Sequence, residues 1–317
     1  MKRLTIIVGP LLAMIIGLMM LVEARPSDDA HGYTSVPFTV DPYRGLGAWI
    51  DVYDYVPEYQ QNGESPAFDA GYVDVLAAHG VRTLYIQAAR FDDRTPEGLV
   101  SPDLLLPFLA RAHAHGMRVV GWYLPKFLDV DQDLNRLVAI AHYDIAGQHF
   151  DGLGVDIEDN QSIPDPGDRN VRLHQLAKKL RAAVGDDAVI SAHVPPTVQL
   201  EVVNPNYWPD FPWRDLHRYF QVWQPMAYWT LRTPESGYQD AYRLTTESVR
   251  RMRELLHDDK AMVHPVGGIA DKVTPDQLTA YIAALKDVDA IGGSLYDAAT
   301  TEMNPGLWAI LQQELAT

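Results

Sequence analysis

Eight short apolar segments recur along this chain, and longer stretches of helical periodicity lie between them. This alternation is typical of proteins in which each strand of a parallel sheet is followed by a helix. Strands are predicted at Gly45–Val52, Thr83–Ala88, Arg118–Leu124, Gly152–Glu158, Val189–Val194, Phe220–Tyr228, Met262–Val266 and Ile291–Tyr296. Helices are predicted at about 68–79, 102–115, 131–148, 169–184, 239–257, 274–286 and 304–315.

Eight such units predict an α/β fold, a single-domain (β/α)8 TIM barrel. An open, doubly wound parallel sheet is the alternative. A dinucleotide-binding sheet of that kind carries a glycine-rich phosphate loop after a strand, and no strand predicted here is followed by one. The sequence therefore favours the barrel, over residues 41–317.

The first residues have the features of an export signal. Lys2 and Arg3 precede an apolar run over residues 4–22, and small residues stand before a cleavage position after residue 24. Residues 1–24 are thus predicted to be a signal peptide or, if uncleaved, a membrane anchor. The polar residues 25–40 are predicted to be a linker. Either interpretation places the barrel outside the cytoplasm, secreted or attached to the cell surface.

Composition excludes several kinds of chemistry. The chain has 317 residues and no cysteine, so it cannot form disulfides, zinc–thiolate sites or a thiol nucleophile. Its formal net charge of −16 disfavours binding to nucleic acid or anionic membrane surfaces. The same charge argues mildly against a strongly anionic substrate. The oligomeric state is left open.

Active sites of barrels lie at the carboxyl ends of the strands. This rule selects a set of polar and charged residues, each at the end of a predicted strand: Asp51, Tyr53, Asp54, Gln87, Arg90, Tyr123, Lys126, Asp156, Glu158, His193, Gln224, Met226, Tyr228, His264, Tyr296 and Asp297.

Within this set, the fourth strand ends in two acids. Side chains alternate between the two faces of a strand, so Asp156 and Glu158 share one face with Gly154. Carboxylates two residues apart are separated by roughly 6–7 Å along a strand. Burying such a pair is costly without partners, which indicates a site of chemistry. The alternative is an acid pair that caps the next helix or binds an arginine.

Two segments of the sequence resemble motifs of glycoside hydrolase family 18, the chitinase-like barrels. Asp151-Gly-Leu-Gly154-Val-Asp156-Ile-Glu158 resembles the fourth-strand signature Asp-Gly-x-Asp-x-Asp-x-Glu, and Gln224-Pro-Met226-Ala-Tyr228 resembles the sixth-strand pattern Gln-x-Met-x-Tyr-Asp. Three positions depart from the family. Gly154 replaces the middle aspartate, Trp229 replaces the acid after the sixth-strand tyrosine, and Tyr296 replaces a tryptophan on the last strand.

The resemblance implies an exported enzyme that cleaves a glycosidic bond in a polysaccharide or glycan. Glu158 would be the general acid, Asp156 would orient a 2-acetamido group of the substrate that acts as nucleophile, and Tyr228 would donate a hydrogen bond to that group. Gln224 and Met226 would contact substrate, although Met226 and Tyr228 are also compatible with plain core packing.

The seventh strand has no carboxylate until Asp271, which disfavours the common arrangement of two catalytic carboxylates on strands four and seven. The nucleophile is then the substrate itself or an acid from another strand. Asp51 and Asp297 are the available acids, and either could instead bind a sugar hydroxyl or serve the fold.

Aromatic rings stack on sugar faces, so Trp122, Trp229 and Tyr296 are predicted to bind substrate, and His193 is predicted to hydrogen-bond it. Metal-dependent amidohydrolase barrels carry His-x-His on the first strand, where this chain has Trp49-Ile50-Asp51. No metal and no cofactor is therefore predicted. The competing functions are a catalytically inactive carbohydrate-binding barrel, favoured by Gly154, and a metal-dependent hydrolase.

Overall fold

The computed structural model describes residues 36–60, 64–92, 94–95 and 98–315. The signal or anchor predicted at residues 1–24 lies outside these residues. The last part of the predicted linker, residues 36–40, packs on the barrel instead. Phe38 is buried, and its carbonyl accepts a hydrogen bond from the Val189 N–H at 3.0 Å. No helix within the described residues has the length and apolar character needed to cross a membrane.

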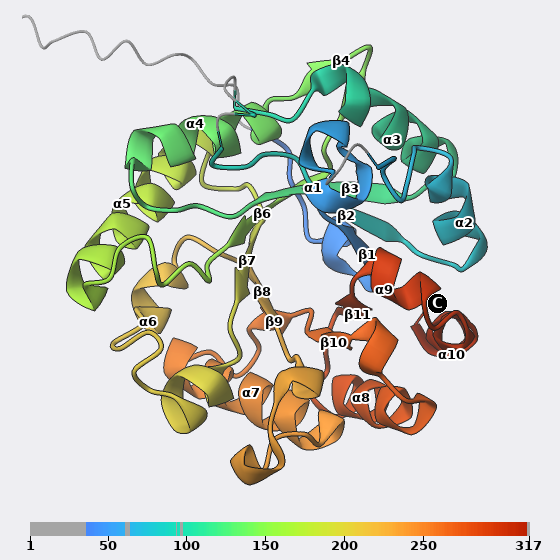
Figure 1. The fold of residues 1–317 in the computed structure, drawn as a ribbon. Coiled ribbons are helices and arrows are strands. Elements are labelled where there is room, and N and C mark those ends of the chain that lie inside the picture. Colours follow the sequence, from blue (N-terminus) through green and yellow to red (C-terminus); the bar gives the residue numbers. More distant parts are fainter. Residues whose placement is uncertain (1–35, 61–63, 93, 96–97, 316–317) are drawn as a thin grey trace, which may run out of the picture. The chain divides into compact units, whose positions relative to one another are not determined.

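The described residues form a (β/α)8 barrel (Figure 1). Nine parallel strands follow one another around it in the order β10-β11-β1-β2-β3-β6-β7-β8-β9, with β9 and β10 as two pieces of the seventh position. A bridge between Met226 and Val266 links the β8 side to β10 and closes the ring. The strands are β1 Gly45–Ile50, β2 Thr83–Gln87, β3 Arg118–Tyr123, β6 Gly152–Asp156, β7 Ile190–Val194, β8 Val222–Pro225, β9 Met262–Val263, β10 Val266–Ile269 and β11 Gly292–Tyr296.

Helices surround the strands, and neighbouring helices contact one another along the outside, as α7 and α8 do (Figure 1). The helices are α1 Val52–Tyr55, α2 Tyr72–Ala78, α3 Pro102–Ala114, α4 Val130–Ala141, α5 Pro166–Val184, α6 Trp213–Leu216, α7 Ala241–Leu256, α8 Pro275–Asp287, α9 Ala298–Glu302 and α10 Gly306–Leu315. A single π-helical turn, Gln199–Val203, interrupts the connection from β7 to α6.

Several predicted elements were wrong in extent: the fourth strand ends at Asp156 and not at Glu158, and the sixth is limited to Val222–Pro225. The helix predicted at 131–148 ends at Ala141, and a hairpin of β4 (Asp144–Ile145) and β5 (Gln148–His149) follows it. Ala146 and Gly147 form the turn with φ of 54° and 75°, a left-handed pair that suits a two-residue hairpin turn. The seventh strand is split at His264-Pro265, because proline lacks the N–H that a continuous strand would donate.

The strands separate two apolar layers. Leu153 and Val155 point outward into the main core beneath the helices, whereas Trp49, Tyr85 and Trp122 fill the barrel interior. Trp49 stacks on Tyr85 with ring centroids 4.3 Å apart. The interior is therefore a packed core, and a ligand of the barrel is expected at the end where the strands terminate.

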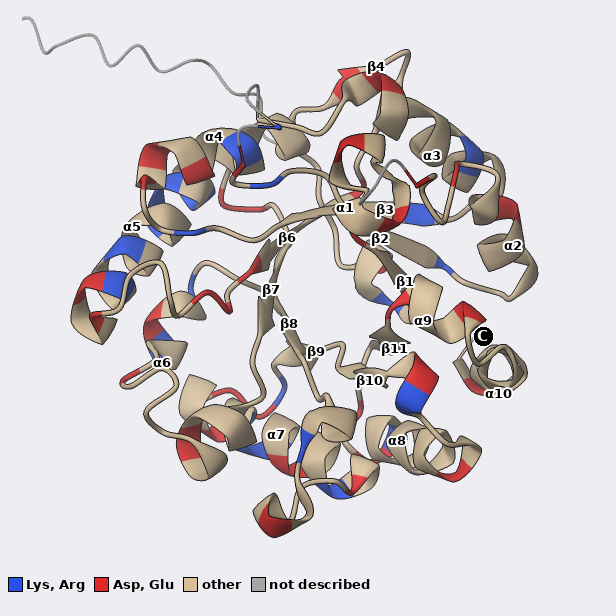
Figure 2. Cartoon of the chain, viewed as in Figure 1, with Lys and Arg blue, Asp and Glu red and all other residues tan. Residues whose placement is uncertain are grey.

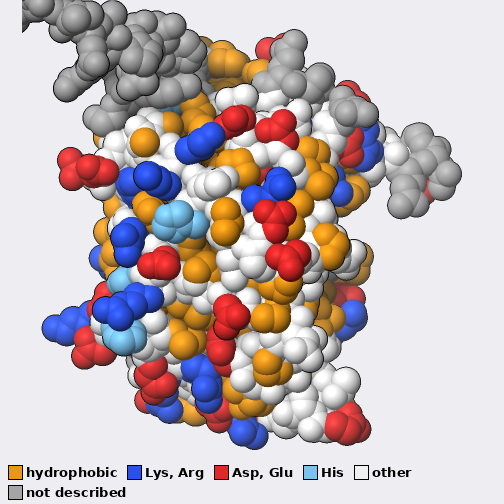
Figure 3. Space-filling model, turned by 90° about the vertical axis from the view of Figure 1, so that its left-hand side faces the viewer, with side chains coloured by type: hydrophobic (Ala, Val, Ile, Leu, Met, Phe, Trp, Pro, Cys, Tyr) orange, Lys and Arg blue, Asp and Glu red, His pale blue; other side chains and the backbone are white. Residues whose placement is uncertain are grey.

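Charged residues are rare in the barrel strands. Arg118 and Asp156 are the only charged residues within the barrel strands, and the remaining charges lie on helices and loops (Figure 2). On the face drawn in Figure 3, acidic and basic side chains are interspersed. The negative charge of the chain is thus spread over its surface, while Asp156 is the single acid that a strand carries into the barrel.

Candidate active site

The strand register confirms that Gly154 and Asp156 face the barrel interior. Gly154 pairs with Trp122 on β3 and with Ser191 on β7, and Asp156 pairs with His193 on β7. A Cβ built on Gly154 would meet the imidazole of His193 inside the barrel. Asp156 thus ends β6 at the open end of the barrel, as the alternation predicted.

Asp156 and Glu158 form a buried acid pair. Asp156 is only 7% exposed, and its Oδ1 has no hydrogen-bond partner among the described residues. Burial, together with the nearby Glu158 carboxylate, raises the pKa of Asp156 well above its usual range. Burial also raises the pKa of Glu158, whose carboxylate oxygens bond to no described residue. The two acids titrate together, so the pair holds a proton under conditions where free carboxylates have lost theirs.

A lysine opposes these shifts. Lys126 follows β3, and its ammonium group bonds to the carboxylate of Asp159, one residue after Glu158. Its positive charge lowers the pKa values of both Asp156 and Glu158, although burial outweighs it. Asp159 in turn accepts the Ser162 N–H at 2.8 Å, which fixes the loop after β6. Lys126 therefore limits the rise in the pKa values of the acid pair.

Two tyrosines link the acid pair to the opposite side of the open end. The rings of Tyr228 and Tyr296 lie 5.7 Å apart, and the Tyr296 hydroxyl donates to Asp51 Oδ2 at 3.1 Å. Burial, and then the charges of Glu158 and Asp156, raise the pKa of Tyr228 well above its usual range. The Tyr228 hydroxyl therefore keeps its proton. It has no hydrogen-bond partner among the described residues, so it can donate a hydrogen bond to a ligand.

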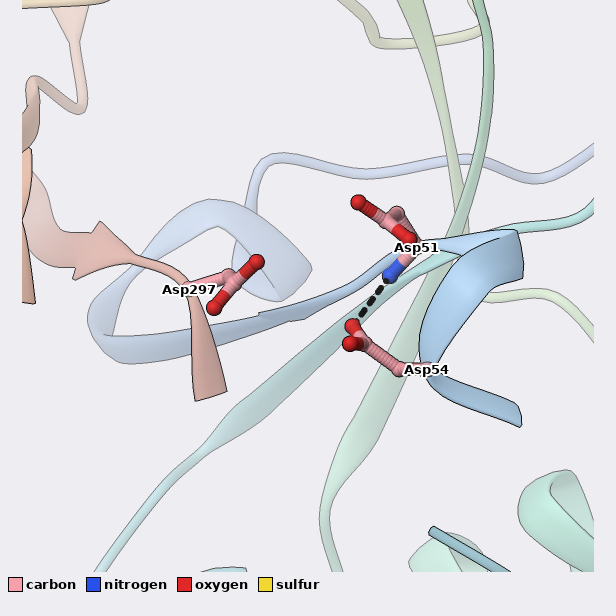
Figure 4. Close-up of side chains that lie close together, drawn as sticks. All are labelled: Asp51, Asp54 and Asp297. Carbon is pink, nitrogen blue, oxygen red and sulfur yellow. Dashed lines mark hydrogen bonds between the residues drawn. The ribbon is translucent and has the colours of Figure 1, made fainter. Parts of the chain in front are cut away.

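Asp51, Asp54 and Asp297 form a carboxylate cluster on this opposite side (Figure 4). One oxygen from each lies within 4.8 Å of the others. Asp51 and Asp297 follow β1 and β11 and cap α1 and α9, with Tyr53 N–H and Thr300 N–H as donors at 2.7 and 2.8 Å. Hard cations such as Ca²⁺ and Mg²⁺ prefer such oxygens. Of the described residues, these three could hold one, but an acidic cluster by itself does not identify a metal site.

The cluster makes stability depend on pH. Burial, followed by the charges of Asp51 and Asp297, raises the pKa of Asp54 to about 8. A carboxyl group whose folded pKa exceeds its unfolded value of about 3.9 stabilises the fold while protonated, and that contribution is lost as pH rises toward 8. We expect Asp54→Asn, which keeps an oxygen for the Asp51 N–H, to flatten the fall in unfolding free energy between pH 4 and 8.

Urea unfolding across this pH range measures the effect, which is at most about 1.4 kcal/mol per pH unit for one proton. Asp259→Asn, on an exposed loop, is the control and should leave the slope unchanged. An unaltered slope in Asp54→Asn would show that Asp54 is already ionised in the folded protein.

A pocket of about 220 Å³ opens beside Glu158. Met226 and Tyr228 line it from β8 and the residues after it, and Tyr207 lines it from the irregular connection after β7. The Tyr207 hydroxyl donates to the carbonyl of Glu158 at 3.3 Å. The pocket therefore gives a ligand access to the Glu158 carboxylate, with both polar and apolar walls.

His193 occupies the space that Gly154 leaves open. A Cβ on Gly154 would lie 2.3 Å from Nε2 of His193, a distance that real contacts do not reach. The imidazole bonds to Ser191 Oγ at 3.2 Å and lies edge-on to Trp49. Burial, with a smaller effect of His264, lowers the pKa of His193 to about 3, so the ring is neutral. A neutral imidazole thus fills the position where the resemblance would place an aspartate.

Four residues predicted to bind substrate are buried in the structure. Trp122, His193 and Gln224 point into the barrel interior and are at most 4% exposed. Trp229 points outward instead, where it is fully buried and packs on Tyr281 of α8 with centroids 5.2 Å apart. The alternation of each strand, or the turn after it, directs these four side chains into a core, and their contact with substrate stays a prediction.

The other predicted site residues lie together at the open end. They are Asp51, Asp156, Glu158, Met226, Tyr228, Tyr296 and Asp297. Asp54 and Lys126 were identified only as strand-end residues without a role. Tyr207 and Arg232 were missed, because they lie in loops whose course over the barrel no periodicity indicates.

Comparison with solved structures identifies the architecture. The chain resembles a glycoside hydrolase family 18 N-acetylglucosaminidase from Paenibacillus barengoltzii, with a TM-score of 0.58 and 10% identity over 86% of this chain and 100% of that one. It has the fold of the glycoside hydrolase barrels. A chitinase from Bacteroides thetaiotaomicron gives a TM-score of 0.58 and 11% identity, covering 86% of this chain and 96% of the other.

The likeness extends beyond the chitinase-like barrels. An endo-1,4-β-D-mannanase from Thermotoga petrophila is similar with a TM-score of 0.56 and 10% identity, over 80% of this chain and 88% of that chain. No family model matches the sequence, and no curated protein is similar to it in sequence. At these identities the structural likeness establishes the fold alone.

Proposed function

We propose that the protein is a glycoside hydrolase that acts on a glycan with 2-acetamido sugars, with Glu158 as general acid. The observation that carries this proposal is the buried acid pair at the open end of the barrel. Asp156 Oδ1 lacks a hydrogen-bond partner, and Glu158 presents a free carboxyl group to the adjoining pocket. An unpartnered buried acceptor costs about 1–3 kcal/mol, which a substrate N–H would recover on binding.

In the first step, Glu158 gives its proton to the glycosidic oxygen as the bond to the anomeric carbon breaks. The carbonyl oxygen of the substrate's own 2-acetamido group attacks that carbon and forms a cyclic oxazolinium. Asp156 accepts the acetamido N–H and stabilises the positive charge that develops, while the Tyr228 hydroxyl donates to the acetamido oxygen. The raised pKa of the acid pair supplies a protonated group for this step.

In the second step, water attacks the anomeric carbon and opens the oxazolinium. Glu158, now a carboxylate, takes the proton from that water and returns to its starting state. The acetamido group is regenerated, so the net reaction is hydrolysis of one glycosidic bond. Lys126, bonded to Asp159, favours the ionised form that Glu158 needs here.

The carboxylate cluster supports substrate assistance over a protein nucleophile. Asp51 and Asp297 cap helices, and Asp51 also accepts the Tyr296 hydroxyl. A nucleophilic carboxylate must be free to form a bond, whereas these oxygens are occupied in holding loops. Asp51 remains the first acid to test if a sugar without an acetamido group is cleaved.

Aryl glycosides separate these mechanisms. We expect the purified protein to release nitrophenol from aryl 2-acetamido-2-deoxyglycosides or their oligomers, and not from the matching glucosides. A thiazoline analogue of the cyclic intermediate should inhibit. Cleavage of glucosides at a similar rate would contradict substrate assistance, and failure on the whole panel would contradict the proposed activity.

A catalytically inactive carbohydrate-binding barrel is the second candidate, and the His193 ring in place of an aspartate favours it. Without that aspartate, Asp156 lacks the second acid that the chitinase-like barrels place below it on the same strand, and Glu158 is left as its acidic neighbour. Binding of chitin oligosaccharides without any turnover, at the same affinity for wild type and Glu158→Gln, would establish this function.

A further inference from the structure

Arg232 lies in the wall of the pocket beside Glu158. The pocket is lined by apolar side chains such as Met226 and Leu231, by Tyr207, and by the Glu158 carboxyl group. Arg232 is the only lysine or arginine among its described lining residues. The pocket thus presents one positive group in the same wall as the proposed general acid.

Two contacts hold the guanidinium group of Arg232 in place. Its Nη1 bonds to Oε1 of Gln199, on the π-helical turn, and its Nε donates to the carbonyl of Tyr228 at 3.4 Å. Nη2 makes no hydrogen bond to a described residue, and no described carboxylate lies within 4.0 Å of the group. A partly buried guanidinium without an anionic partner is costly, since charges taken from water need a counter-charge.

Among the described residues, the buried Arg169 and Arg181 also form no ion pair, but they bind carbonyl oxygens within the fold. Arg181, for example, donates to the carbonyls of Gly185 and Ala188. Arg232 differs because it borders a space that a ligand can enter. Guanidinium groups bind carboxylates through charge-assisted hydrogen bonds, so a guanidinium with a free Nη2 in a pocket wall suits a carboxylate of the ligand.

We propose that the substrate carries a carboxylate on the sugar bound next to the scissile bond, and that Arg232 recognises it. The inference rests on the proposed function for the place of the scissile bond, but not for the binding of the anion. A uronic acid and an amino sugar with a carboxyalkyl ether both supply this group. Arg232 would then determine which glycans are bound productively at Glu158.

The net charge of −16 does not prevent this binding. Charges separated by more than about 8 Å are largely screened at physiological ionic strength, so binding of the carboxylate depends mainly on the nearby Arg232. Lys126 bonds to Asp159 and partly offsets the acid pair on the other side of Glu158. The pocket wall therefore carries one positive group, Arg232, within an acidic protein.

Binding to wild-type protein provides the first test. Calorimetry would compare glucuronic acid-containing oligosaccharides and N-acetylmuramic acid-containing disaccharides with the same compounds after reduction of the carboxyl group to an alcohol. We expect one carboxylated series to bind about 10- to 100-fold more tightly than its reduced form, with a preference that falls as salt increases. The series that shows this preference identifies the source of the carboxylate. Equal binding of both forms in both series would overturn the proposal.

Variants then assign the preference to Arg232. Arg232→Gln should lose it while retaining affinity for the reduced ligands, and Arg232→Lys should keep part of it, because charge remains and the paired geometry is lost. Arg218→Gln, on an exposed surface, is the matched control. An equal loss of affinity for carboxylated and reduced ligands in Arg232→Gln would mean that Arg232 only supports Tyr228 and would refute its recognition role.

The two proposals fail separately. A carboxylate preference that depends on Arg232, measured in Glu158→Gln, would uphold the recognition site even if no glycan is cleaved. Turnover of acetamido glycosides without such a preference would uphold the hydrolase and reject the recognition site.

Discussion

Replacing Glu158 by glutamine is expected to reduce turnover by about 10²- to 10⁴-fold on any glycoside that the wild type cleaves. Glutamine keeps the volume of the side chain but cannot donate a proton to the leaving oxygen. Because the Glu158 carboxylate bonds to no described residue, its loss removes no contact on which the fold depends. The rate of substrate hydrolysis under saturating conditions measures the effect.

Two comparisons make this result specific. Glu254→Gln, on the exposed face of α7, changes the same functional group far from the pocket and should retain full activity. Removing a carboxyl group with a raised pKa should leave Glu158→Gln as stable as the wild type, or more stable, at neutral pH. Wild-type activity in Glu158→Gln, with the fold intact, would refute the assignment of the general acid.

The pH dependence of wild-type activity is a second, independent test of the Asp156–Glu158 pair. Since burial raises both pKa values, the acidic form persists toward neutral pH, and Lys126 limits this effect. Loss of Lys126 would raise both pKa values further, because its positive charge no longer favours the carboxylates. The pH dependence of activity is therefore expected to arise from Asp156 on β6 and from Glu158 and Lys126 in the loops after β6 and β3.

The sequence was sufficient to predict the barrel and the grouping of several candidate site residues at one end of it. Strand–helix alternation identified all eight strand positions, and the rule that sites lie at strand ends placed Asp156, Glu158, Tyr228 and Tyr296 together. These inferences succeed because they depend on periods of two and 3.6 residues, which are local properties of the chain.

The orientation of individual side chains could not be predicted, because it depends on contacts between segments that are distant in the sequence. Whether a tryptophan at a strand end stacks on a ligand or on another core ring depends on the direction in which the strand or its turn ends. Trp229 was predicted to bind substrate, but the turn after β8 directs it under α8. Likewise Arg232 lines the pocket and bonds to Gln199 on the π-helical turn, and no pattern in one segment contains that information.

Gly154 is the clearest example of a residue that sequence patterns could not explain, since its role depends on a neighbour on another strand. His193 fills the space above Gly154, with Nε2 where a Cβ would need to be. The ring is 2% exposed and lies between Trp49 and Trp122, so it has little room to move away. The glycine and the histidine are therefore a matched pair across β6 and β7.

We expect Gly154→Asp to be strongly destabilising, although it would restore the pattern of the chitinase-like barrels. Overpacking against His193 costs about 1–3 kcal/mol, and a buried carboxylate without partners adds about 1–3 kcal/mol. Gly154→Ala carries the cost of overpacking without that of the buried carboxylate. Comparing the unfolding free energies of the two variants in urea therefore separates the two costs.

A second substitution tests whether His193 is the cause. In the Gly154→Asp background, His193→Ala should restore part of the lost stability, whereas in the wild type it should create a cavity and destabilise. The added carboxylate would then lie below Asp156, and since two such close acids cannot both ionise, the pair would share a proton and shift the pH–activity profile. If Gly154→Ala is as stable as the wild type, or if the two substitutions prove additive, then His193 does not occupy this space and the register of β6 against β7 is not the one described.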